Sequence, residues 1–146
     1  MDLIDDDPLI DDEALIYRLF TRDIPPDHYI ASEVDVTTWE LMPYGRFSCI
    51  TDGGGNGPGI WHTILSVNVF GNGTDEAFAY ARELDRIIRN WGDPGVAVLP
   101  GLGSVESAER EQKFTRVGSV EVNGKNVTQY LGTYELTLRY QPPTSP

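Results

Sequence analysis

Apolar and polar residues alternate through the middle of the chain. Leu65, Val67 and Val69 recur at every second position between Trp61 and Gly71, with polar residues between them. A period of two is typical of a strand that buries one face and exposes the other. We therefore predict a half-buried strand over this segment.

A helix is predicted to follow this strand directly. Residues 71–73, Gly-Asn-Gly, favour a sharp turn, and Thr74 is expected to cap the helix by accepting a hydrogen bond from a free backbone N–H group. Gly92 and Pro94 are expected to end it. Its apolar residues follow the three- and four-residue steps of one helical face: Ala77, Tyr80, Ala81, Leu84, Ile87, Ile88 and Trp91.

A second amphipathic helix is predicted near the N-terminus, running through Phe20. Its start is open between Asp7, which would place Pro8 in the first helical position, and Asp11. The Pro-Pro pair at 25–26 is expected to end it, because the residue before a proline is pushed toward an extended conformation.

Two further strands are predicted before the central one. Residues 34–39 alternate weakly and carry β-branched side chains, and residues 47–51 form a clearer strand that begins after a turn at 43–45. The 47–51 segment is expected to pair with the central strand as a hairpin with a long loop. Residues 105–116 stay open, because 107–112 has helical propensity while its surroundings look extended.

The C-terminal part of the chain predicts a hairpin and a long last strand. Asn123-Gly124 favours a type I′ turn between two short strands. One face of the last strand is expected to carry Tyr130, Tyr134, Leu136, Leu138 and Tyr140. The residues between them, Leu131 to Arg139 at every second position, are expected to occupy the other face.

Together these elements predict an α+β fold, with an antiparallel or mixed β-sheet and two amphipathic helices packed on one face. The 146 residues fit a single domain, 1–146. An acidic leader at 1–7 and a Pro-rich tail at 141–146 are expected to be flexible. The uncovered face of the sheet and its edges would then need a partner or polar side chains.

Composition narrows the function classes. The chain has 11 Lys and Arg against 23 Asp and Glu, a formal charge of −12, which disfavours tight DNA or RNA binding. Cys49 is the only cysteine, so no disulfide forms within the chain, as suits a reducing cytoplasm. No apolar run is long enough to span a membrane, and the acidic start is unlike a signal peptide, so we expect a soluble, unprocessed protein.

The glycine-rich loop is the most conspicuous motif. Gly53, Gly54, Gly55, Asn56 and Gly57 precede a strand instead of opening a helix, and the lysine of a phosphate-binding loop is missing. We therefore interpret these five residues as an assembly-interface loop.

Other side chains offer little chemistry. Cys49 and His62 flank the loop and would be the nucleophile and base of a small hydrolase, although a small buried apolar role for Cys49 and a polar strand position for His62 are favoured. Two histidines and one cysteine do not supply the four ligands of a structural zinc site. We predict no catalytic, cofactor-binding or metal-binding residues, and no cofactor.

Four segments together form a pattern known from another protein family. They are the helix at Ala14–Phe20, the strand at Trp61–Gly71, the helix from Asp75 through Ile88 and the strand at Gln129–Tyr140. In this pattern, which covers most of the chain, the protein resembles the tail terminator (tail completion) proteins of bacteriophages with long, non-contractile tails.

This resemblance implies a small subunit that assembles into a hexameric ring on the head-proximal end of the tail tube. The ring stops tube elongation and provides the surface on which the head docks. The implied partners are further copies of the chain, the tail tube protein and the head–tail connector proteins, while genomic DNA passes without specific binding. The implied locations are the virion tail and, during assembly, the host cytoplasm.

Two alternatives stay open at this point. The first is a neck or head-completion adaptor of the same virion, which would share the patterning of small assembly subunits. The second, of a different class, is the small hydrolase, which requires Cys49 and His62 or perturbed carboxylates to meet in a pocket.

Overall fold

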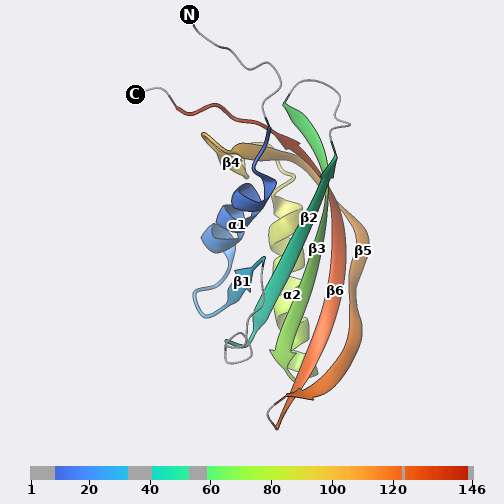
Figure 1. Ribbon diagram of the computed structural model, residues 1–146. Helices are drawn as coiled ribbons and strands as arrows, with labels where there is room; N and C mark the ends of the chain where they lie inside the picture. The colour runs from blue at the N-terminus through green and yellow to red at the C-terminus, as the bar shows by residue number, and fades with distance from the viewer. Residues whose placement is uncertain (1–8, 33–40, 53–58, 123, 145–146) are drawn as a thin grey trace, which may run out of the picture.

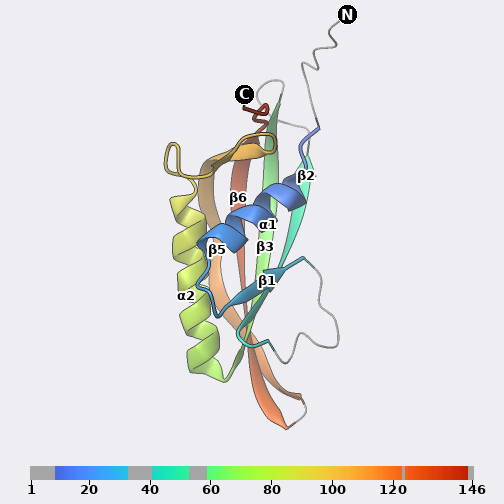
Figure 2. The ribbon, with the colours of Figure 1, turned by 90° about the vertical axis from the view of Figure 1, so that its left-hand side faces the viewer.

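The protein has two layers, a mixed β-sheet and two helices that both lie on one of its faces (Figures 1 and 2). The computed structural model describes residues 9–32, 41–52, 59–122 and 124–144. The elements are α1 (Asp12–Asp23), β1 (Tyr29–Ala31), β2 (Tyr44–Asp52), β3 (Ile60–Asn72), α2 (Thr74–Asn90), β4 (Val98–Leu99), β5 (Gly103–Val122) and β6 (Lys125–Arg139). This arrangement confirms the predicted α+β fold with its helices on one face.

Within the described residues the sheet has the order β1-β2-β3-β6-β5-β4. β1 pairs with β2 in parallel, and the other neighbours are antiparallel, so the sheet is mixed. β2 and β3 pair along nine residues, with Cys49 opposite Leu65, which confirms the predicted long-looped hairpin. The predicted turn at 43–45 is wrong, because Tyr44 and Gly45 already pair with both neighbouring strands.

The strand predicted at 34–39 and the glycine loop at 53–57 both lie outside the described residues. The segment left open at 105–116 belongs to β5, a strand of 20 residues paired with β6. Pairing overrides the local helical propensity of 107–112. Several register shifts interrupt the β5–β6 ladder, as expected where bulges absorb extra residues.

The β5–β6 hairpin turns where the sequence predicts it. Val122 pairs with Lys125, and Gly124 has a φ of 79°, which favours glycine. β6 buries the predicted face, and Tyr134, Leu136 and Leu138 are fully buried.

The first residue and the N-cap of each helix can be compared with the prediction. α1 begins at Asp12, with the Asp11 carboxylate accepting a hydrogen bond from the Ala14 N–H at 3.0 Å, so the start at Asp11 is confirmed and the start at Asp7 is wrong. For α2 the cap is Gly73, at a φ of 90°, and Thr74 is the first helical residue. The predicted Thr74 cap is wrong, because the chain leaves β3 through a backbone conformation that favours glycine.

The core fills the space between the two layers. Its fully buried large side chains come from both helices, from the residue that follows α2 and from β2, β3 and β6: Leu15, Ile16, Leu19, Phe20, Phe47, Leu65, Tyr80, Leu84, Ile88, Trp91, Tyr134 and Leu136. Three hydrogen bonds fix the helices on this core. The Tyr134 hydroxyl donates to Asp85 at 2.7 Å, the Trp91 indole donates to Asp23 at 2.8 Å, and the Tyr80 hydroxyl donates to a β1 carbonyl at 2.9 Å.

Candidate interaction surfaces

Cys49 lies on β2 and faces α1. Burial, and secondarily the nearby carboxylates of Asp12 and Glu13, raise the pKa of its thiol to about 12. Because the thiolate is the nucleophilic form of cysteine, this environment keeps the side chain unreactive at neutral pH.

His62 lies on the other face of the sheet. Its neighbour Thr63 contacts the Thr51 hydroxyl, which in turn bonds to Asp12 of α1, so Thr63 faces the helices. Successive residues of a strand point to opposite faces, and His62 therefore faces away from them. The structure does not bring Cys49 and His62 together, so the pair that the hydrolase alternative uses is not formed.

The described residues carry neither a cluster of metal ligands nor a membrane-spanning helix. Within the described residues, no group of three or more His, Cys, Asp or Glu side chains is placed to hold a metal ion. No helix in the described part of the chain is long and apolar enough to cross a membrane. The predicted interface loop, Gly53 to Gly57, lies outside the described residues, and its role stays a prediction.

The sheet has a partly open edge on each side. β1 pairs only with residues 44–46 of β2, and β4 pairs only with residues 103–104 of β5. Among the described residues, no strand pairs with the outer side of β2 from 47 to 51 or of β5 from 106 to 121. Such edges present backbone donors and acceptors to a further chain or to water.

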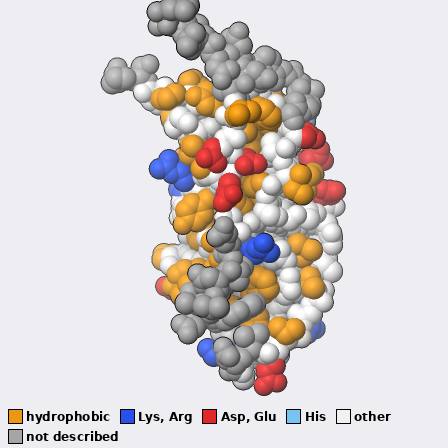
Figure 3. Space-filling model, viewed as in Figure 1, with side chains coloured by type: hydrophobic (Ala, Val, Ile, Leu, Met, Phe, Trp, Pro, Cys, Tyr) orange, Lys and Arg blue, Asp and Glu red, His pale blue; other side chains and the backbone are white. Residues whose placement is uncertain are grey.

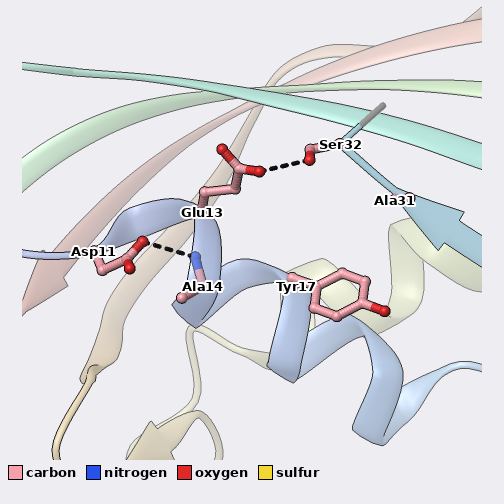
Figure 4. A pocket seen from close by; sticks show the side chains of 6 residues that line it. All are labelled: Asp11, Glu13, Ala14, Tyr17, Ala31 and Ser32. Carbon is pink, nitrogen blue, oxygen red and sulfur yellow. Dashed lines mark hydrogen bonds between the residues drawn. The ribbon is translucent and has the colours of Figure 1, made fainter. Parts of the chain in front are cut away.

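A groove lies between α1 and the end of β1, beside the open edge of β2. It has a volume of about 610 Å³ and is lined by Asp11, Glu13, Ala14, Tyr17, Ala31 and Ser32, which we call the α1 groove. Figure 4 shows Glu13 pointing from α1 toward Ser32, whose hydroxyl donates to the carboxylate at 2.5 Å. A smaller hollow of about 200 Å³ continues from it along residues 47–49 of β2.

The α1 groove is acidic. None of the ion pairs among the described residues includes Asp11, Asp12 or Glu13. Their charges are instead held by hydroxyl and backbone donors and by the positive end of α1. Figure 3 shows acidic side chains gathered over the N-terminal end of this helix. The groove therefore presents negative charge that no basic side chain of the described structure neutralises.

A contrasting surface lies at the opposite edge, where α2 passes over β6 and β5. Asp85 of α2 accepts the Tyr134 hydroxyl and the Arg89 guanidinium, with the Nε–oxygen distance of Arg89 at 3.0 Å. The Arg110 guanidinium of β5 approaches the same carboxylate at 3.6 Å. One buried phenol and two arginines thus share a single carboxylate, and the arginines keep a net positive charge.

Phe78 and Arg82 extend this surface along the same side of α2. The Phe78 ring is 45% exposed and packs against Tyr130 of β6, with ring centroids 5.7 Å apart. The Arg82 guanidinium lies over the Phe78 ring at 5.8 Å and forms no ion pair within the described part of the chain. We call Phe78, Arg82, Asp85, Arg89 and Arg110 together the α2–β5 flank.

The two surfaces lie on opposite sides of the molecule. Figure 2 shows α1 and β1 crossing the β2 side of the sheet and α2 running along the β5 side. The molecule therefore carries an acidic groove at one edge and an arginine-rich flank at the other.

The face of the sheet away from the helices is mainly uncharged. The register aligns Ser48, Ser66, Thr133 and Gln112 in one row across four strands. The Gln129 amide donates to Asn68 at 2.7 Å in the neighbourhood of this row. Hydroxyl and amide side chains thus make this row polar, which is one of the two expectations for the uncovered face, a partner or polar side chains.

Sequence reasoning missed both charged surfaces. Asp11 is predicted as a possible start of the N-terminal helix, but the groove that it lines together with Glu13 is not predicted. The three- and four-residue spacing of Phe78, Arg82, Asp85 and Arg89 was likewise visible as one stripe of the helix.

Neither a scan against protein-family models nor a comparison with curated proteins finds a match to this chain.

Proposed function

We propose that this chain is a tail terminator, a subunit that assembles into a hexameric ring on the head-proximal end of a phage tail tube. In this role it stops tube elongation and provides the surface on which the head docks. Its partners are further copies of itself, the tail tube protein and the head–tail connector proteins. It works in the virion, after assembly in the host cytoplasm.

The observation that carries the proposal is the presence of two different surfaces at opposite edges of one small sheet. A closed ring is a heterologous assembly, in which every subunit offers its neighbours two distinct patches. The α1 groove and the α2–β5 flank are two such patches. Surfaces of this kind suit a subunit that makes contacts on both sides, as a ring requires.

Three further features support the proposal. The four segments on which the resemblance rests all form the elements expected of them, in α1, β3, α2 and β6. The long β5–β6 hairpin extends beyond the helix layer (Figure 1) and offers a further contact surface apart from the groove and the flank. The formal charge of −12 disfavours retention of DNA, as a passage for the genome requires.

The test is tube capping. Purified tail tube protein is polymerised with and without the chain, and tube lengths are measured by negative-stain electron microscopy. A terminator shortens the length distribution at substoichiometric amounts and appears as added density at one end of each tube. Tubes that grow to the same length, with no chain at their ends, would refute the proposal.

The same samples separate the terminator from the neck adaptor. DNA-filled heads are added to capped tubes and to bare tubes, and joined particles are counted. A terminator raises head joining only when it is already on the tube end. A chain that binds heads and ignores tube ends would instead be a neck or head-completion adaptor.

A further inference from the structure

The α1 groove and the α2–β5 flank are complementary in charge. The groove presents Asp11 and Glu13 without a basic partner among the described residues, and the flank presents Arg82, Arg89 and Arg110 around one carboxylate. Contact between a groove and a flank is attractive, whereas groove-to-groove and flank-to-flank contacts place like charges together. The charges therefore favour a head-to-tail contact over a symmetric dimer.

The side chains on the two surfaces are of the kinds that anchor protein interfaces. Tyr17 in the groove and Phe78 on the flank are each 45% exposed. Aromatic residues and arginine are enriched in interfaces, where they supply most of the binding free energy. Phe78 and Arg82 also stack on each other, which holds both side chains in place before contact.

The open strand edges lie beside these surfaces, and their residues determine whether copies pair strand to strand or touch through side chains only. The open edge of β5 carries charged residues and the register shifts of the β5–β6 ladder. Charges and bulges are the usual devices that prevent an edge from pairing with another sheet. The contact is therefore made by side chains, and a continuous sheet running from copy to copy is disfavoured.

We propose that neighbouring copies join by seating the α2–β5 flank of one copy in the α1 groove of the next. This inference rests on the proposed ring, because it assigns the surfaces through which the ring's subunits touch. Arg82 is the central cation, since it has no carboxylate partner within the described structure, and Glu13 is the central anion. Because groove and flank lie at opposite edges, each copy uses both, and the contacts form a ring where the rotation from copy to copy closes.

The test uses Glu13→Arg and Arg82→Glu, each alone and then mixed in equal amounts. Either variant alone faces a like charge across every contact. In the mixture, an Arg82→Glu flank meets a Glu13→Arg groove, and the other contact of each copy is the wild-type one. All contacts are then attractive, provided that the two variants alternate around the ring.

Assembly is followed by light scattering across protein concentration and by negative stain, in solution and on tube ends. Each single variant should need at least roughly tenfold more protein than the wild type to assemble. The mixture should assemble within about threefold of the wild-type concentration, in rings with an even number of subunits. Single variants that assemble normally, or a mixture that stays as weak as its components, would overturn the inference.

Matched controls guard against a general effect of charge. Glu121→Arg and Lys125→Glu make the same charge changes at exposed positions at the far end of the β5–β6 hairpin and should leave assembly in solution unchanged. Thermal unfolding verifies that all variants fold. If Glu13→Arg unfolds because it places a cation at the start of α1, Glu13→Gln takes its place and should weaken assembly by a smaller factor.

The outcomes separate this inference from the proposed function. A wild-type chain that forms no ring in solution or on tube ends refutes the ring and this contact together. A wild-type chain that caps tubes, with variants that cap equally well, refutes the contact and leaves the terminator function standing.

Discussion

Raising the pH above about 9 should lower the free energy of unfolding of this protein, first with a shallow slope and then with a steeper one. Three buried groups carry the effect: the Cys49 thiol and the phenols of Tyr80 and Tyr134. Burial is the main cause that raises the pKa of each, with the Asp12 and Glu13 carboxylates adding to it at Cys49. In the unfolded chain the thiol loses its proton near 9.0 and the phenols near 10.0.

The direction of the change in stability depends on whether the folded or the unfolded state holds more protons. Above these ordinary values the unfolded chain has released its protons while the folded chain keeps them, so the free energy of unfolding falls as pH rises. Each group contributes about 1.4 kcal/mol per pH unit. Between about pH 9 and about pH 10 only Cys49 lowers the free energy of unfolding. Above about pH 10 all three groups lower it, together by about 4 kcal/mol per pH unit.

By about pH 11 the loss amounts to about 5 kcal/mol, the whole free energy of unfolding of a marginally stable domain. Urea unfolding, followed by far-UV circular dichroism under reducing conditions, measures this free energy from about pH 8 to about pH 11. The full stability should be present below about pH 9.

Two variants test the assignment of the groups. Cys49→Ala should abolish the slope between about pH 9 and about pH 10, and Tyr134→Phe should reduce the slope above it by about a third. A free energy of unfolding that stays constant to about pH 11 would refute the reasoning. An unchanged lower slope in Cys49→Ala would refute the role of the thiol.

Substitutions at three positions test the packing and hydrogen bonding. Gly71→Ala should lower the free energy of unfolding by about 3 kcal/mol, seen as a lower thermal midpoint, because its Cβ would lie 2.5 Å from the backbone nitrogen of Ala77. Asp11→Ala should cost about 1 kcal/mol in urea unfolding, whereas Asp11→Asn, which still caps α1, should be nearly neutral. Tyr134→Phe should cost about 1.5 kcal/mol at neutral pH by removing the donor to Asp85, and an unchanged urea midpoint would contradict the importance of that bond.

The parts of the fold that the sequence predicts well are those specified locally. β3 and β6 alternate apolar and polar residues because one face of each meets the helices and the other does not. α2 follows its helical period for the same reason. Hairpin turns with glycine at a positive φ, as at Gly124, are also local signals.

The parts of the fold that the sequence does not predict depend on contacts between residues that are far apart in the chain or on the backbone of a neighbouring element. Residues 107–112 have helical propensity, yet they pair with β6, and that pairing is set by the hairpin at 123–124. The Thr74 cap failed because the exit from β3 requires the backbone conformation of Gly73, which overrides a side-chain preference at the next residue.

The two candidate surfaces were also not predictable, because each forms only when segments that are distant in the sequence pack together. The α1 groove exists only because α1 packs beside the end of β1, and β1 is too short to give a periodic signal. The α2–β5 flank needs Arg110 to reach Asp85, which follows only once β5 is known to be a strand. Composition gives the net charge, but a net charge does not show that acidic side chains gather at one edge of the fold and basic ones at the other.

That separation resolves a difficulty in assembling a chain with a formal charge of −12. Copies of such a chain repel one another on average, which keeps the free protein dispersed and disfavours random association. In the proposed ring, the arginine-rich flank on one edge overcomes this repulsion where it meets the acidic groove, whereas groove-to-groove and flank-to-flank approaches bring like charges together. The net charge thus suppresses wrong contacts while the local charges select one orientation. Specificity of this kind needs both the attractive pair and the repulsive background, because attraction alone would not prevent alternative pairings.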